Sequence, residues 1–191
     1  MKTATVTLEG ISPYSQSRMY EHDAGMERLS KESPEDYRKR TWRSYLHVDA
    51  EGFVMIPSMA LKNCLSESAK FLNIQIPGKG KATYTKNIEA GVILPQHARL
   101  VGVRAEDVAA EHLFLPADGR RGSGKRIWKI YPVIPAGWRA EGVFLVGDDT
   151  VTKDVFEQIL REAGALIGLG RFRPRNNGFY GRFSVESVKW S

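Results

Sequence analysis

Two segments of the sequence have the apolar period of an amphipathic helix, and each directly follows a short strand pattern. The first, residues 58–72, places apolar side chains every three or four positions: Leu61, Leu65, Ala69 and Leu72. The second, residues 152–163, carries a wider stripe: Val155, Phe156, Ile159, Leu160 and Ala163. This spacing puts the apolar side chains on one face of each helix, where they can pack on strands. Ser58 can cap the first helix, and Gly164 can take the left-handed conformation at the end of the second.

Strand patterns flank both helices. Three segments alternate apolar and polar side chains: 3–11, 138–146 and 183–190. Shorter apolar runs mark further strands at 53–56, 92–94, 100–103 and 127–135. The last of these is expected at a sheet edge, because Pro132 and Pro135 have no amide to donate. The order of strands and helices predicts an α+β sandwich of the ferredoxin-like βαββαβ kind.

A chain of 191 residues fits a single domain, here 1–191. Its core is expected in three segments: 1–12, 52–77 and 132–191. Residues 13–51 have no sustained apolar stripe and are expected to form a long loop. Within that loop, Ser33-Pro34-Glu35-Asp36 marks the start of a short surface helix that runs to about Trp42.

The composition indicates a protein of the cytoplasm without a bound group. A single cysteine, Cys64, excludes an internal disulfide and fits a reducing compartment. No apolar run approaches the ~20 residues of a membrane span. No cluster of carboxylates, histidines or cysteines has metal-ligand spacing, and Gly78-Lys79-Gly80-Lys81 lacks the spacing of a P-loop. We therefore expect no metal, no cofactor and no membrane contact.

The distribution of charge favours a polyanionic partner. The chain has 28 Lys and Arg against 22 Asp and Glu, a formal net charge of +6. Many of its cations gather in three stretches: Arg38, Lys39, Arg40 and Arg43; Arg120, Arg121, Lys125, Arg126 and Lys129; Arg171, Arg173, Arg175 and Arg182. Such segregation is typical of nucleic-acid binders, although solvated surface loops can look the same.

The third stretch lies in a segment rich in glycine and arginine, residues 168–183. Gly168, Gly170 and Gly178 can free backbone amides for close approach to an anion. Arginines at alternate positions 171, 173 and 175 can present guanidinium groups to phosphate oxygens. The aromatic residues of the segment can either stack on bases or fill the core, and the sequence leaves both readings open for Phe172, Phe179 and Tyr180.

Two motifs in this order resemble the RAMP superfamily of CRISPR systems, most of all the backbone subunits that coat guide RNA. The first is Ile56-Pro57-Ser58-Met59-Ala60-Leu61-Lys62, and the second is the glycine-rich segment after the second helix. Ser58 and Lys62 match the family's serine and lysine, which lie by the RNA. Met59-Ala60 depart from its pattern, as does Asn63, where the family usually has glycine.

The resemblance implies an RNA-recognition-motif-like (RRM-like) fold with an inserted thumb hairpin, here about residues 78–131. It implies that single-stranded or guide RNA is held by its phosphates, with copies of the same chain and other CRISPR subunits as partners. The RNA-binding residues expected on this reading are Ser58, Lys62, Arg40, Arg43, Arg120, Arg121, Lys125, Arg126, Gly168, Gly170, Arg171, Phe172, Arg173, Arg175 and Gly178.

The same resemblance raises the question of RNA cleavage. Backbone subunits that cut their target carry an aspartate in the loop before the Ile-Pro strand, but the matching stretch here is Arg40-Thr41-Trp42-Arg43. The guide-processing endoribonucleases of the superfamily often use histidine, for which His47 beside Tyr45 is the candidate. Binding without cleavage is our first hypothesis and an endoribonuclease the second. The third is a mobile-element protein that mimics a backbone subunit and inhibits a CRISPR complex.

Overall fold

The main body of the molecule is an antiparallel sheet of six strands, seen in a computed structural model that describes residues 1–120, 122 and 124–191. The strands are β1 (Lys2–Gly10), β2 (Phe53–Ile56), β3 (Val92–Ile93), β4 (Ala98–Arg104), β7 (Arg139–Val146) and β8 (Phe183–Trp190). Their order is β2-β4-β7-β1-β8, and β3 pairs with β7 beside β4. The expected α+β class is confirmed, and the antiparallel sheets are compatible with an RRM-like core.

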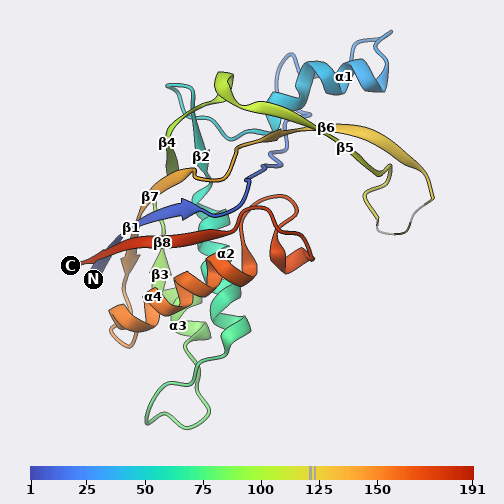
Figure 1. Cartoon of the computed structure of the whole chain (residues 1–191). Helices are drawn as coiled ribbons and strands as arrows, with labels where there is room; N and C mark the ends of the chain where they lie inside the picture. The colour runs from blue at the N-terminus through green and yellow to red at the C-terminus, as the bar shows by residue number, and fades with distance from the viewer. Residues whose placement is uncertain (121, 123) are drawn as a thin grey trace.

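β1 lies between β7 and the edge strand β8 and shows why one face of the sheet is buried. It pairs with β7 and with β8, so that Val6 lies opposite Gly142 on one side and Val188 on the other. Alternate residues Ala4, Val6 and Leu8 are fully buried, as the two-residue period of a strand requires. Figure 1 shows the helices α2 (Ser58–Leu72), α3 (Thr85–Gly91) and α4 (Lys153–Glu162) gathered on one side of the sheet.

Helix α2 buries the apolar stripe expected from the sequence, including Leu61, Leu65 and Ala69. The expected cap is wrong, since Pro57 occupies the N-cap position and no side chain caps the helix. Ser68 in the middle of α2 donates to the carbonyl oxygen of Ile159 on α4 at 2.9 Å, which ties the two helices together.

Helix α4 starts as the sequence predicts and ends differently. The side chain of Thr152 accepts a hydrogen bond from the amide of Val155. Instead of stopping at Gly164, the chain continues as a π-helical turn over Ala163–Ile167, and Gly168 takes the positive φ of 71°. Gly164 is needed for close packing, because a Cβ there would lie 2.0 Å from the carbonyl oxygen of Phe183.

Strands β5 (Ala109–Pro116) and β6 (Arg126–Val133) form a second, two-stranded sheet. β6 pairs with β5 alone, so the edge strand expected at 127–135 is present, in this small sheet and not in the six-stranded one. The hairpin extends away from the six-stranded sheet, beside helix α1 (Pro34–Thr41) and the turn η1 (Trp42–Tyr45) (Figure 1). The predicted surface helix in the long loop is thus present, and the Ser33 hydroxyl accepts from the amide of Asp36 at its start.

The other short elements connect these parts. They are the 3₁₀ turns η2 (Ala105–Asp107), between β4 and β5, and η4 (Pro174–Asn176), in the glycine-rich segment. None of the helices in the described ranges is long and apolar enough to cross a membrane.

Candidate nucleic-acid interface

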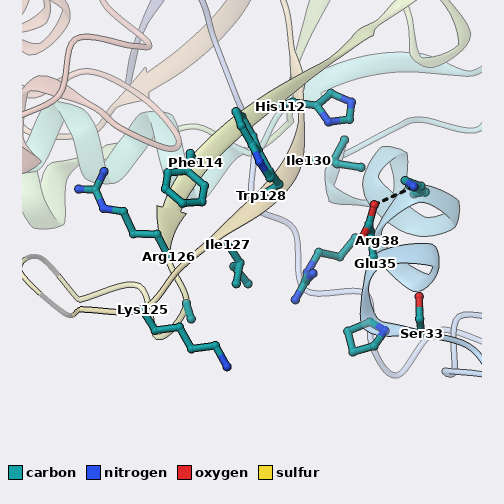
Figure 2. A pocket seen from close by; sticks show the side chains of 13 residues that line it. Ser33, Glu35, Arg38, His112, Phe114, Lys125, Arg126, Ile127, Trp128 and Ile130 are labelled. Carbon is teal, nitrogen blue, oxygen red and sulfur yellow. Dashed lines mark ion pairs between the residues drawn. The ribbon is translucent and has the colours of Figure 1, made fainter.

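A groove of about 1010 Å³ lies between α1 and the β5–β6 hairpin. On the α1 side it is lined by Ser33, Pro34, Glu35, Arg38 and Lys39. On the hairpin side it is lined by His112, Phe114, Ala117, Lys125, Arg126, Ile127, Trp128 and Ile130. Figure 2 shows the two walls, with Trp128 on the hairpin and Arg38 reaching in from α1. We call this space the hairpin groove.

The hairpin side of the groove carries an exposed aromatic pair. Phe114 on β5 lies directly opposite Trp128 on β6, with ring centroids 5.3 Å apart and planes tilted by 46°. The two side chains remain 48% and 60% exposed. Their mutual contact therefore leaves ring surface uncovered, and such surface can stack on a nucleobase.

Cations surround this aromatic pair. Lys39 is paired with Glu35 at 2.8 Å, one turn away on α1. Within the part of the chain that the structure describes, Arg38, Lys125 and Arg126 make no ion pair. The groove therefore combines uncovered rings with unpaired positive charge, which is the combination that binds single-stranded nucleic acid.

The glycine-rich segment does not form the cradle of free amides expected from the sequence. The amide of Gly168 donates to the carbonyl of Ala163, and the amide of Gly178 donates to that of Arg173. A Cβ at Gly170 would lie 2.2 Å from the carbonyl oxygen of Ser15. The amides of Gly168 and Gly178 are thus not free for an anion, and close backbone packing accounts for glycine at these positions. The anion contact predicted for Gly170 stays a prediction.

The three alternate arginines of this segment do not line one edge. Arg173 and Arg175 both turn to Glu67 on α2, with N–O distances of 2.8 and 2.9 Å. Arg171 turns instead to the root of the hairpin, where its guanidinium carbon lies 3.7 Å from the ring centre of Tyr131 and 5.1 Å from that of Tyr45. The row of parallel forks predicted from the sequence is therefore wrong.

The aromatic residues of the segment, left open by the sequence, divide between two roles. Tyr180 is buried and donates its hydroxyl to Glu111 on β5 at 2.7 Å, and burial raises the pKa of this phenol to about 12. Phe172 packs between Tyr131 and Tyr180 with a positive φ of 56°. Phe179 is 59% exposed. The buried Tyr180 and the half-buried Phe172 thus pack within the protein at the hairpin root.

Lys62 and Ser58, carried over from the family motif, lie apart from the hairpin groove. The Lys62 ammonium group donates to Ser66 and to the carbonyl oxygens of Ile88 and Glu89, and the residue is only 9% exposed. Burial lowers the pKa of this lysine. All three of its donors are used internally, so a direct phosphate contact by Lys62 conflicts with the structure. The Ser58 amide donates to His97 Nδ1 at 3.0 Å.

The remaining predicted cations have mixed surroundings. Arg40 is held by Glu32 at 2.8 Å and by the carbonyl oxygens of two loop residues. Arg43 lies over the ring of Trp42, 4.5 Å from its centre. Arg120 is exposed in the β5–β6 turn, whereas Arg121 falls outside the described residues. The RNA contacts predicted for all of these residues stay predictions.

The histidine and the tyrosine considered for catalysis have separate surroundings. The Tyr45 ring packs against Tyr20 and Tyr131, and burial raises the pKa of its phenol. Burial and the charge of Arg18 lower the pKa of His47. No hydrogen bond joins the side chains of His47 and Tyr45 in the structure as described. No group of three or more His, Cys, Asp or Glu among the described residues could hold a metal ion.

The two residues that most distinguish this surface, Phe114 and Trp128, were not predicted as site residues. A local signal for the first was present, because Leu113-Phe114-Leu115 is a short apolar run of the kind that marks a strand. Their pairing depends on the register of β5 with β6, which no local pattern specifies.

No family model matches the sequence, and no curated protein matches it. Solved structures do. A chain in the cryo-EM structure of the Type III-B Cmr-beta bound to cognate target RNA has 12% sequence identity and a TM-score of 0.50; the match covers 99% of this chain and 60% of that one. The crystal structure of Cmr6 from Pyrococcus furiosus has 14% identity and a TM-score of 0.48; that match covers 97% and 98% of the two chains.

At 12% identity, the likeness to the chain of the Type III-B Cmr-beta structure shows a shared fold. This fold agrees with the resemblance stated from the two motifs. This chain spans 60% of the length of the chain that it matches in the Cmr-beta structure.

Proposed function

We propose that this protein is an RNA-binding subunit of a CRISPR ribonucleoprotein and binds single-stranded RNA in the hairpin groove. The observation that carries the proposal is the exposed Phe114–Trp128 pair, which lies between the unpaired cations Arg38, Lys125 and Arg126. Rings supply stacking surface for bases, and the cations supply attraction for the phosphates.

The strand order supports a RAMP-type role. The elements β1, α2, β4, β7, α4 and β8 follow one another as in a βαββαβ fold, and the four strands lie side by side in the order β4-β7-β1-β8. We assign these six elements as the RRM-like core, with β2 added at the edge. On this assignment the β5–β6 hairpin, inserted between β4 and β7, is the thumb.

The partners follow from the same proposal. A structurally similar chain occurs in a Cmr complex bound to target RNA, so we propose guide or other single-stranded RNA as ligand and other CRISPR subunits as neighbours. We also propose that further copies of this chain are partners in the complex and that the protein is located in the cytoplasm. Arg120 precedes the groove residues Lys125 and Arg126 in the sequence, and we assign it to the same surface.

On the uncovered sheet face, the neighbouring strands β1 and β7 do not offer a second stacking site of the kind that RRM proteins use. The residues of β1 that point away from the buried face are Thr3, Thr5, Thr7 and Glu9. Opposite them on β7 are Leu145, Val143, Glu141 and Arg139. Since none of these side chains is aromatic, the hairpin groove is the better place for bases.

Binding of a fluorescently labelled, unstructured RNA tests the proposal by anisotropy. Because stacking on one ring contributes ~1–3 kcal/mol, Trp128→Ala is expected to raise Kd by about fivefold or more. Phe71 is a matched control, since it is equally exposed but lies on α2 away from the groove. Equal affinities of wild type, Phe114→Ala, Trp128→Ala and Phe71→Ala would overturn the proposal.

The same RNA distinguishes binding from cleavage. Incubation with and without Mg²⁺ is expected to leave the labelled RNA intact, because His47 and Tyr45 make no catalytic pair. Product that appears with wild type and disappears with His47→Ala would instead support the endoribonuclease.

A further inference from the structure

The root of the hairpin holds a group of cations that the hairpin groove does not account for. Lys129 and Tyr131 project from the same side of β6, because residues two apart in a strand share a face. The Arg171 guanidinium packs over the Tyr131 ring, with its central carbon 3.7 Å from the ring centre. Lys129 and Arg171 are therefore close neighbours at this root.

Arg38 is the third member of the group. It lines the hairpin groove from α1, which packs on β6, and its charge acts on Lys129 together with that of Arg171. Burial and these two cations lower the pKa of Lys129. Arg38 therefore lies between the groove and the hairpin root.

The three charges lack the carboxylate partners that neighbouring arginines have. Arg173 and Arg175 share Glu67, whereas no ion pair is present for Arg38, Lys129 or Arg171 in the ranges that the structure describes. The Nε atom of Arg171 is buried without a hydrogen-bond partner. Lys129 donates to the carbonyl oxygen of Ala117 at 3.2 Å, which is an uncharged acceptor.

The acidic residues nearby do not neutralise the group. Glu111 accepts the Tyr180 hydroxyl, and Asp118 accepts the amide of Arg120 while attracting Lys129 through space. The charges of Arg38 and Arg171 thus both oppose that of the partly buried Lys129, and Asp118 attracts it. Such an arrangement is costly in the free protein and is relieved when an anion binds.

We propose that Arg38, Lys129 and Arg171 form a binding site for one phosphate group at the root of the β5–β6 hairpin. This inference rests on the proposed RNA-binding function and adds a fixed phosphate position to it. Tyr131 and Tyr45 hold the Arg171 guanidinium in place, so little side-chain freedom is lost when it binds phosphate oxygens. Arg38 connects this position with the bases stacked in the hairpin groove.

Salt dependence of RNA binding tests the site. Each phosphate contact with a single strand contributes a slope of about −0.7 in log K against log salt. Lys129→Gln is expected to lower the magnitude of that slope by about 0.7, which corresponds to about fivefold weaker binding at 0.1 M salt. Arg171→Lys keeps the charge and is expected to keep most of the slope. Lys189→Gln, an exposed cation on β8, is the matched control with an unchanged slope.

Inorganic phosphate supplies a readout independent of RNA. For wild type and for Lys189→Gln, millimolar phosphate is expected to raise the melting temperature more than the same concentration of chloride does. For Lys129→Gln, the two anions are expected to have the same effect on the melting temperature. Arg171→Gln can be measured in the same way, but it removes a packed side chain. If Arg171→Gln does not fold, Lys129→Gln alone decides the test.

The outcomes separate the two proposals. RNA binding with the same salt slope in wild type and Lys129→Gln overturns the phosphate site and leaves the RNA-binding function standing. Phosphate stabilisation that Lys129→Gln abolishes, without any RNA binding, supports the anion site and overturns the function. Absence of both effects overturns both.

Discussion

The ammonium group of Lys62 on α2 lies 3.2 Å from the carbonyl oxygen of Ile88, near the end of α3. Together with its bond to Glu89, this contact satisfies carbonyl groups that the short helix leaves without partners. Lys62→Met is therefore expected to lower the free energy of unfolding by about 1–3 kcal/mol, because two carbonyl oxygens lose a charged donor.

Urea unfolding measures this effect, and Lys70→Met on the exposed side of α2 is its control. RNA affinity of the folded Lys62→Met variant is expected to equal that of wild type. Weaker RNA binding with unchanged stability would restore the family-based prediction that Lys62 contacts RNA.

Arg175 offers a direct test of the corrected arginine assignment. Its ion pair with Glu67 already compensates its charge, so Arg175→Ala is expected to change RNA affinity by less than about twofold. Arg126→Ala, in the hairpin groove, is expected to weaken binding by about fivefold at 0.1 M salt. Titrations with the same labelled RNA compare the two variants, and the reverse ranking would contradict the structure.

Gly178 tests whether the glycines serve packing. A Cβ at this position would lie 1.9 Å from the carbonyl oxygen of Phe172, a backbone atom that has little room to move. Gly178→Ala is expected to lower the free energy of unfolding by about 1–3 kcal/mol. Gly124→Ala, where a Cβ meets nothing within 4 Å, is the control and should unfold at the wild-type urea concentration.

The bond from Tyr180 to Glu111 predicts a pH dependence of stability. Burial raises the pKa of Tyr180 to about 12, above its ordinary value of 10.0, so the folded state retains a proton that the unfolded chain loses. The stability contributed by Tyr180 is therefore complete below pH 10 and is lost as the pH rises toward 12. Urea unfolding of wild type and Tyr180→Phe at pH 8 and pH 11 should give a smaller difference at pH 11; a constant difference would contradict the assignment.

Local patterns predicted the parts of the fold whose side chains have a regular period. The stripes of α2 and α4 and the alternation of β1 were sufficient to place these elements, and the burial of Leu65, Phe156 and Val6 agrees with them. The prolines of β6 correctly indicated an edge strand, but the sequence did not reveal which strand it pairs with. Pro132 is opposite Ala110 in the hairpin, where the partner strand β5 had not been identified.

The candidate site was less predictable because it depends on contacts between distant segments. The charge of Arg173 is compensated by Glu67, 106 residues away in sequence, and no local spacing reveals such a partner. Likewise, the ring beneath Arg171 comes from β6 and not from its own segment. Charge patterning identified the basic loop at Lys125 and Arg126, which does line the groove.

The separation of the β5–β6 hairpin from the main sheet has a mechanical consequence. A two-stranded ribbon is barely stable alone, and this one shares no ladder with the six-stranded sheet. Its direction is set by contacts at its base, among them the packing of Tyr45, Tyr131 and Arg171 and the bond from Tyr180 to Glu111. Amide exchange should therefore be faster in β5 and β6 than in β1, and an occupied groove would slow the exchange in these two strands.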